Sequence, residues 1–400
     1  MAIPQQKPVT AERKHRRRRR RHVWKDKHFR WVPDGQGDWR VQAYVYRHHH
    51  KPKRGHFRGP GVKPPRRAAA AAPAPVIAAS DPRPPGAFQG DFGHAQAVRL
   101  LQRAGFGPVP GQADQLASLG LVAAVRSLTR PSGSAVLSGP PPRDDDGNPL
   151  APADAWGHDH LWWLDRMVRT SQPLVERMAL VLHDWFATSN ANVSTTQQMI
   201  DQSNLFRSRC FGSFLDLFRA VTVDPAMLQW LNGAENTKQA PNEHYAREMM
   251  ELFSLGADRG AYTEDDIREQ ARALTGWRYD WSNELGAYNF RFDPKRHDTD
   301  PKTVFGRTGN WNWEASCQLC VENPLHPSFF VDKLWSYFVA TPAPEATRNA
   351  LISTYVSRGW RIQPVLETIL SEFGTRRVSQ SPSNRRIASM SAAGSQGLAM

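Results

Sequence analysis

Apolar residues recur along most of the chain at intervals of three and four positions, the spacing that places them on one side of an α-helix. Short clusters of Pro, Gly, Asp and Asn separate these stretches and mark where helices end. The segment 174–187 is apolar on nearly all sides, so we expect it to be a central helix. The other predicted helices are 92–104, 113–128, 154–169 with a stripe of Trp156, Leu161, Trp162, Leu164 and Met167, 195–208, 211–221, 225–231, 313–321, 327–339, 344–358 and 363–373.

Two further helices, 242–256 and 263–276, are predicted from their capping residues as well as their periodicity. The side chain of Asn242 can accept a hydrogen bond from a backbone N–H one turn on, and Gly256 can end that helix in a left-handed conformation. Thr263 and Asp266 form a variant of the capping box at the start of the second helix. Together the two helices predict a tight αα-hairpin. Its apolar sides contain Tyr245, Ala246, Met249, Met250, Leu252 and Phe253 in the first helix, and Ile267, Ala271 and Leu274 in the second.

The segment 278–312 has no helical period, and we expect a long irregular loop there. Within it, 288–292 and 302–305 are predicted to pair as a short β-hairpin. Long loops inside compact domains are uncommon and tend to bind or react. The predicted fold is therefore mainly α: a single large multi-helix domain over 91–374 with one long irregular loop.

Positive charge is concentrated at the N-terminus. Residues 1–67 contain 21 Lys and Arg against 4 Asp and Glu, a net charge of +17, whereas the remaining 31 basic and 34 acidic residues give −3. We expect 1–67 to be a disordered, basic, low-complexity arm with a β-hairpin at 29–46. Such an arm would bind polyanions, or it would be a solvated leader without a binding role. The polyanion-binding candidates are Arg16, Arg17, Arg18, Arg19, Arg20 and Arg21.

The segments that flank the predicted domain are poor in periodic apolar residues. An Ala/Pro linker is predicted at 68–90, and its beginning, 66–80, resembles a weak export signal. Residues 375–400 are rich in Ser, Arg and Ala, and we expect a disordered or truncated tail. No apolar run reaches about 18 residues, so no membrane-spanning helix is predicted. Cys317 and Cys320 form a CxxC in a predicted helix, where packing is the favoured role over a zinc or redox site.

Three groups of polar residues offer carboxylates and imidazoles for acid/base catalysis or for a divalent metal ion. The groups are His183 with Asp184; Glu243, Arg247, Glu248 and Glu251; and Asp293, His297, Asp298 and Lys302. Each group also has a structural interpretation. In the same order, these are a hydrogen-bonded core histidine, a ladder of surface ion pairs such as Glu243–Arg247 and Arg247–Glu251, and a loop closed by its own Asx-turns at Asp293 and Asp298. The catalytic candidates are Glu243, Arg247, Glu248, His297 and Asp298, and the metal candidates are His183, Asp184, Glu251 and Asp293.

Several of these stretches carry a family resemblance. NEHYAREMMELFSLG at 242–256, YTEDDIREQARALTGW at 262–277 and FDPKRHD at 292–298 resemble the signature of the bacterial "domain of unknown function 1800" family. RLLQRAGFGP at 99–108 and ERMALVLHDWFATS at 176–189 fit the same pattern, so that the resemblance spans about 92–374. It implies a mostly helical, often exported bacterial protein. The family's activity is unassigned, so the resemblance implies no mechanism.

Two hypotheses about function follow from the sequence. The first is a hydrolase-like enzyme that uses a divalent metal or an acid/base pair drawn from the polar groups. The second is a non-catalytic binding or assembly protein that its basic arm tethers to a polyanion, which could be nucleic acid, an anionic membrane surface or an anionic polymer of the cell envelope. The sequence leaves open whether the protein is an enzyme, and it predicts no oligomeric state or compartment.

Overall fold

The computed structural model describes residues 27–33, 39–45 and 87–372. The chain divides into two compact units, Met1–Ala69 and Ala70–Met400. In the first unit, β1 (Lys27–Pro33) pairs antiparallel with β2 (Trp39–Val45), where the sequence predicts a hairpin. The arginines 16–21, the signal-like segment 66–80, most of the predicted linker and the predicted tail lie outside the described residues.

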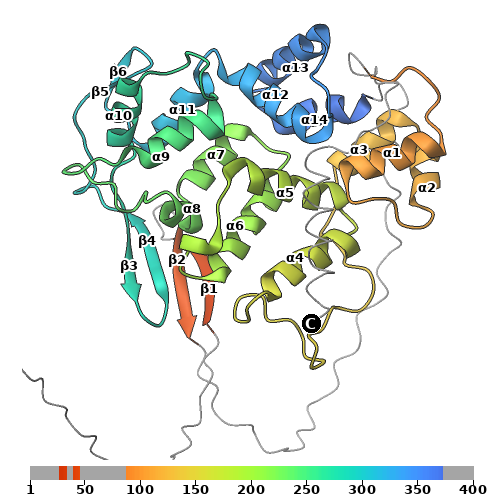
Figure 1. Cartoon of the computed structure of the whole chain (residues 1–400), viewed down its shortest axis with the longest axis horizontal. Helices are drawn as coiled ribbons and strands as arrows, with labels where there is room; N and C mark the ends of the chain where they lie inside the picture. Colours follow the sequence, from red (N-terminus) through yellow and green to blue (C-terminus); the bar gives the residue numbers. More distant parts are fainter. Residues whose placement is uncertain (1–26, 34–38, 46–86, 373–400) are drawn as a thin grey trace, which may run out of the picture. The chain divides into compact units, whose positions relative to one another are not determined.

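The second unit is mainly helical, as the sequence predicts, with fourteen α-helices between residues 94 and 371 (Figure 1). The first eight are α1 (His94–Ala104), α2 (Gln112–Leu119), α3 (Leu121–Thr129), α4 (His158–Arg169), α5 (Pro173–Phe186), α6 (Thr196–Arg209), α7 (Phe214–Thr222) and α8 (Pro225–Trp230). The others are α9 (Glu243–Glu248), α10 (Glu264–Ala273), α11 (Trp313–Glu322), α12 (His326–Phe338), α13 (Glu345–Ser357) and α14 (Ile362–Ser371). No helix in the described part of the chain is long and apolar enough to cross a membrane.

Helix α5 lies at the centre of one continuous hydrophobic core, as its nearly all-apolar sequence predicts. At its C-terminal end, Trp185 and Phe186 are buried and make ring contacts with aromatic residues of four other elements. These partners are Phe206 of α6, Phe214 and Phe218 of α7, Phe253, and Phe329, Phe330 and Tyr337 of α12. Burying one such ring stabilises the fold by about 2 kcal/mol, so the junction positions α5 firmly.

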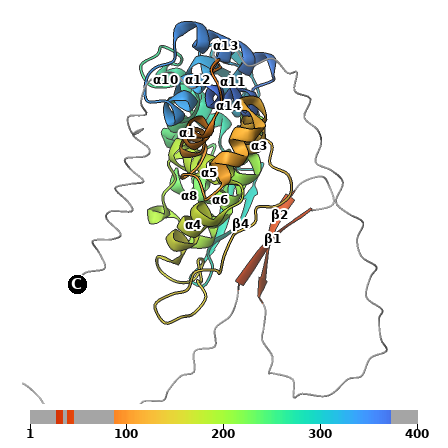
Figure 2. The same cartoon turned by 90° about the vertical axis from the view of Figure 1, so that its right-hand side faces the viewer.

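The beginning and the end of the described helical unit pack together. Figure 2 shows α1 and α3 beside α14, which closes the unit. Arg130, just after α3, pairs with Glu367 of α14 at 2.8 Å, and the Thr129 hydroxyl donates to the same carboxylate. The backbone N–H of Phe88 donates to the carbonyl of Ser371. These long-range contacts join segments that are more than 230 residues apart in the chain.

The αα-hairpin begins at the predicted caps but contains an unpredicted π-helical turn. Asn242 accepts from the His244 N–H at 2.9 Å. After α9 the helix continues as a π-helix, η2 (Met249–Ser254), in which the Leu255 N–H donates to the Met250 carbonyl five residues back. A π-turn closes its hydrogen bonds over five residues instead of four, so side chains within it leave the α-helical register. Leu252, predicted on the apolar side, is 42% exposed, and the other predicted members of that side are buried.

The segment after α10 is more regular than the sequence predicts. It contains two antiparallel hairpins, β3 (Trp277–Ser282) with β4 (Gly286–Phe292), and β5 (Lys302–Val304) with β6 (Arg307–Gly309). The predicted pairing of 288–292 with 302–305 is therefore wrong, because each segment pairs with its own sequence neighbour. Pairing with the nearer segment closes a shorter loop and therefore costs less conformational entropy. Figure 1 shows β5 and β6 beside α10, which is the contact on which the candidate site depends.

Candidate functional site

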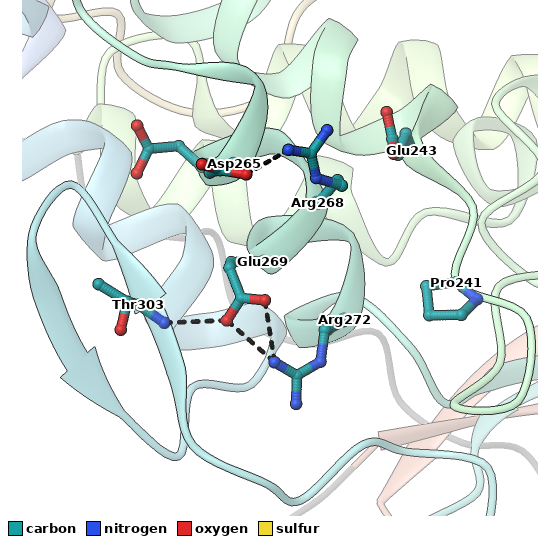
Figure 3. A pocket seen from close by; sticks show the side chains of 8 residues that line it. Pro241, Glu243, Asp265, Arg268, Glu269, Arg272 and Thr303 are labelled. Carbon is teal, nitrogen blue, oxygen red and sulfur yellow. Dashed lines mark hydrogen bonds and ion pairs between the residues drawn. The ribbon is translucent and has the colours of Figure 1, made fainter.

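An open pocket of about 620 Å³ lies between the start of α9, the outer face of α10 and strand β5 (Figure 3). Four acidic side chains and two arginines line it, so its surface is charged and carries a net negative charge. The lining residues are Pro241, Glu243, Asp265, Asp266, Arg268, Glu269, Arg272 and Thr303. Of the predicted catalytic residues, only Glu243 lines this pocket; Glu248 and His297 do not.

The first turn of α10 holds the β5–β6 hairpin against the helix. Thr263 and Asp266 form the predicted capping box, in which Asp266 Oδ2 accepts from the Thr263 N–H at 2.8 Å. The other oxygen of the same carboxylate accepts from the Phe305 N–H at 2.7 Å. One turn further along α10, Glu269 Oε2 accepts from the Thr303 N–H at 3.0 Å, as Figure 3 shows. Two carboxylates of α10 therefore bind the backbone of the hairpin.

Arg272 links the same helix to the loop between the two hairpins. Its guanidinium donates to Glu269 at 2.9 Å within α10 and to Asp298 Oδ2 at 2.7 Å across the interface. Burial raises the pKa of the Asp298 carboxyl, but the hydrogen bonds from Arg272 and the Asp300 N–H outweigh it and leave the pKa below its ordinary value. Asp298 is thus held ionised in a cross-link between α10 and the loop.

Lys302 is fully buried beneath this loop. Its ammonium donates to the carbonyl oxygens of Asp298 at 2.5 Å and Asp300 at 2.8 Å, and it lies 3.9 Å from the Asp298 carboxylate. Burial lowers the pKa of Lys302, and Asp298 partly offsets the effect. A buried ammonium with these acceptors fixes the loop's backbone, because removing it would leave carbonyl groups unsatisfied.

His297 and Asp293 are also engaged within the loop. His297 Nδ1 lies 2.9 Å from the Thr275 carbonyl, and burial lowers the pKa of the imidazole, so the neutral ring donates to that carbonyl. Asp293 Oδ1 accepts from the Lys295 N–H at 3.0 Å, and its other oxygen lies 3.3 Å from Arg278. The Asp300 N–H donates in the same way to Asp298 Oδ1. The Asx-turns that the structural interpretation predicts are therefore present at both aspartates.

The charged side of α9 makes a different set of ion pairs from the predicted ladder. Arg247 donates two hydrogen bonds to Glu264, at 2.9 and 2.7 Å, and lies 3.5 Å from Glu243. The predicted Arg247–Glu251 pair does not form among the described residues, because Arg247 reaches across to the start of α10. Glu248 makes no hydrogen bond or ion pair in the described part of the chain, and burial raises the pKa of its carboxyl while His244 opposes the shift.

His183 and Asp184 lie at the end of α5, and neither lines the pocket. The His183 ring stands edge-on to Trp163 of α4 at 5.1 Å, and burial lowers the pKa of the imidazole. Asp184 accepts from the hydroxyl of Tyr337 in α12 at 2.8 Å. Within residues 27–33, 39–45 and 87–372, no three His, Cys, Asp or Glu side chains come together in an arrangement that could hold a metal ion. The metal candidates His183, Asp184, Glu251 and Asp293 are therefore not brought together.

The residues that dominate the pocket are not among the candidates predicted from the sequence, although their spacing is a signal for them. Asp265, Arg268, Glu269 and Arg272 recur at intervals of three and four along α10, which places all four on its polar face. The pattern identifies a charged helix face, but it does not identify β5 as the element that packs there. Cys317 and Cys320 are buried free thiols in α11, with Cys317 Sγ 3.2 Å from the Thr222 hydroxyl.

Fold and site together define a large helical domain in which a polar helix face and a charged loop are cross-linked around an open pocket. The model of the DUF1800 family, described as a protein of unknown function, matches residues 99–390, and the chain belongs to this family. The match continues past residue 374 into the segment predicted as a tail. No curated protein and no solved structure matches the chain.

Proposed function

We propose that this chain is a non-catalytic binding or assembly protein that its basic N-terminal arm tethers to a polyanion. The observation that carries the proposal is the use of the predicted catalytic groups as cross-links. Asp298 is bound by Arg272, His297 by the Thr275 carbonyl, and Arg247 by Glu264. A general acid or base must reach a substrate proton, and a group saturated by its own chain is poorly placed to do so.

The distribution of charge along the sequence supports the tether. The described helical stretch, 87–372, contains 26 basic and 33 acidic residues, a net charge of −7, in contrast to +17 for 1–67. This separation of charge supports a role in which the arm attracts an anionic partner and the helical unit does not. Lys and Arg that neutralise phosphates or sulfates release counterions, so the binding should weaken steeply as salt is added.

Retention on a heparin column tests the tether. The full chain should elute at high salt, and a variant with the arginines 16–21 replaced by glutamine should elute much earlier. The variant with the same six positions replaced by lysine is the matched control, because it keeps the charge. If glutamine and lysine variants elute together with the full chain, the arm does not provide the tether.

Glu248 favours a second candidate function, acid/base catalysis. It is the only predicted catalytic residue that makes no hydrogen bond or ion pair in the described part of the chain, and its raised pKa suits a carboxyl that accepts or donates protons nearer to neutral pH. His244 is exposed and lies one turn before the half-buried Glu248 on the same side of α9. Together they offer an imidazole and a carboxyl to an incoming substrate.

A substitution that preserves shape separates the two functions. Glu248→Gln should leave heparin retention unchanged and should not lower thermal stability, since the side chain has no hydrogen-bond partner to lose and the substitution removes a partly buried charge. If the chain hydrolyses p-nitrophenyl acetate or bis-p-nitrophenyl phosphate and Glu248→Gln lowers that rate at least tenfold, where general acid–base catalysis is worth about 10² or more, the non-catalytic proposal is wrong. The matched control is Glu251→Gln, three residues further along in η2.

A further inference from the structure

Helix α4 presents an apolar stripe that the described part of the chain leaves exposed. Leu161, Leu164 and Val168 are 48%, 51% and 73% exposed, and their spacing of three and four residues places them on one side of the helix. His160 is also exposed on this side, and Asp165, four residues after Leu161, is paired with Arg169 at 2.5 Å and is only 12% exposed. Only Met167 of α4 is buried, so most of the helical stripe seen in the sequence faces outward.

The stripe is extended at both ends. Trp156, just before the helix, is fully exposed, and Val136 is 65% exposed. Val136 lies at the C-terminal end of α4, where its carbonyl accepts from the Ser171 N–H at 2.8 Å. Several large apolar side chains exposed along one helix and its two ends are candidates for a contact with another apolar phase or molecule. We call Val136, Trp156, Leu161, Leu164 and Val168 the α4 stripe.

The α4 stripe is held rigidly on its far side. Arg166 donates to the buried carboxylate of Glu176 in α5 at 3.0 Å, and Arg207 of α6 donates to the same group at 2.8 Å. Both guanidinium groups also lie over the Trp162 ring, at 5.4 and 5.1 Å. The helix is therefore anchored by its polar and aromatic side while the aliphatic side is left outward.

We infer that the α4 stripe inserts into the surface of an anionic lipid bilayer, the polyanion to which the arm is tethered. This inference rests on the proposed tether and names its partner. Leu and Val side chains cannot stack on bases, and neither nucleic acid nor an anionic polysaccharide offers an apolar interior for them. A bilayer of anionic lipids offers both a negative surface for the arm and a hydrocarbon boundary for the stripe.

The charges imply that both contacts are needed. The described helical stretch has a net charge of −7, and the acidic run 144–146 precedes α4, so this part of the chain is repelled by anionic headgroups. The arm, with its net charge of +17, provides the attraction. Peripheral binding that combines a basic segment with a small apolar contact is much stronger than either contact by itself.

Flotation with vesicles tests the inference. The probes are vesicles of phosphatidylglycerol and phosphatidylcholine in equal parts, and vesicles of phosphatidylcholine alone. The test variant is Leu161→Gln, Leu164→Gln and Val168→Thr in the full chain. The matched control is Leu119→Gln, Val109→Thr and Val356→Thr, whose side chains are 51%, 55% and 50% exposed on other elements. All six positions are exposed, so both variants should fold.

We expect the full chain and the control to float with the anionic vesicles and not with the neutral ones, and the test variant to bind the anionic vesicles roughly tenfold more weakly. Equal binding by test and control variants would overturn the inference, as would a change in oligomeric state of the test variant in sedimentation without a loss of vesicle binding. Heparin retention should be the same for both variants. The two failures are distinguishable: unchanged heparin retention of the arginine-to-glutamine variant would contradict the tether, whereas equal flotation of the test and control variants with the tether intact would contradict only the inference.

Discussion

Lys302 gives the sharpest test of the cross-linked loop. Its side chain is fully buried, and its ammonium donates to the carbonyl oxygens of Asp298 and Asp300 at 2.5 and 2.8 Å. Lys302→Met retains the length of the side chain and removes both hydrogen bonds. A hydrogen bond to a charged group contributes about 1.5–3 kcal/mol, and removal of the buried charge also removes its desolvation cost, which offsets part of the loss. We therefore expect the free energy of unfolding to fall by about 3 kcal/mol.

The assay is urea unfolding followed by circular dichroism, with the midpoint compared at an unchanged slope. The control is Lys295→Met, which removes the same charge from an exposed position in the same loop and should change the free energy of unfolding by less than about 0.5 kcal/mol. If Lys302→Met is as stable as Lys295→Met, the buried ammonium does not hold the loop and the reasoning is refuted.

Three further outcomes are expected. His326 is buried between the Ser254 carbonyl and the Tyr355 hydroxyl, and burial lowers its pKa to about 4. The stability that the neutral ring contributes is complete above about pH 6.5 and is lost as the pH falls towards 4, by about 3 kcal/mol in all. When the free energy of unfolding is measured against pH, His326→Gln should flatten this slope. Gly276→Ala should lower the free energy of unfolding in urea by roughly 2 kcal/mol or more, because φ is +116° and the new Cβ would lie 2.6 Å from the Phe292 ring. Gly306→Ala, where φ is +74° and the space is open, should lower it by about 1 kcal/mol. Equal losses in the two variants would contradict this packing. Iodoacetamide should label none of Cys210, Cys317 and Cys320 in the folded protein, because burial raises the pKa of each thiol. Labelling at neutral pH without unfolding would contradict the burial of these thiols.

The sequence predicted the parts of the fold that depend on local chemistry. The cap at Asn242 and the capping box of Thr263 and Asp266 are formed as expected, because each requires only a side chain within reach of its own helix. The apolar run of α5 likewise required burial wherever the helix packed. These signals fix helix starts and inward faces without knowledge of the tertiary structure.

What the sequence did not predict depends on contacts between distant segments. The π-turn at Leu252 has no local signature. The segments 288–292 and 302–305 were predicted to pair with each other, whereas each pairs with its own neighbour in the sequence. In the candidate site, the sequence identified Asp298 and Arg247 but not their partners Arg272 and Glu264, which come from α10. A charged side chain looks the same in a sequence whether it faces a substrate or another segment of its own chain.

The central claim is that charged residues of the loop and of α10 bind one another and fix the loop. A double-mutant cycle between Arg272 and Asp298 measures this directly, using Arg272→Met, Asp298→Ala and the double variant in urea unfolding. The side chains are 24% and 11% exposed and 2.7 Å apart. We predict a coupling free energy of about 2 kcal/mol. A coupling below about 0.5 kcal/mol, typical of exposed ion pairs, would contradict the claim and leave Asp298 available for another role.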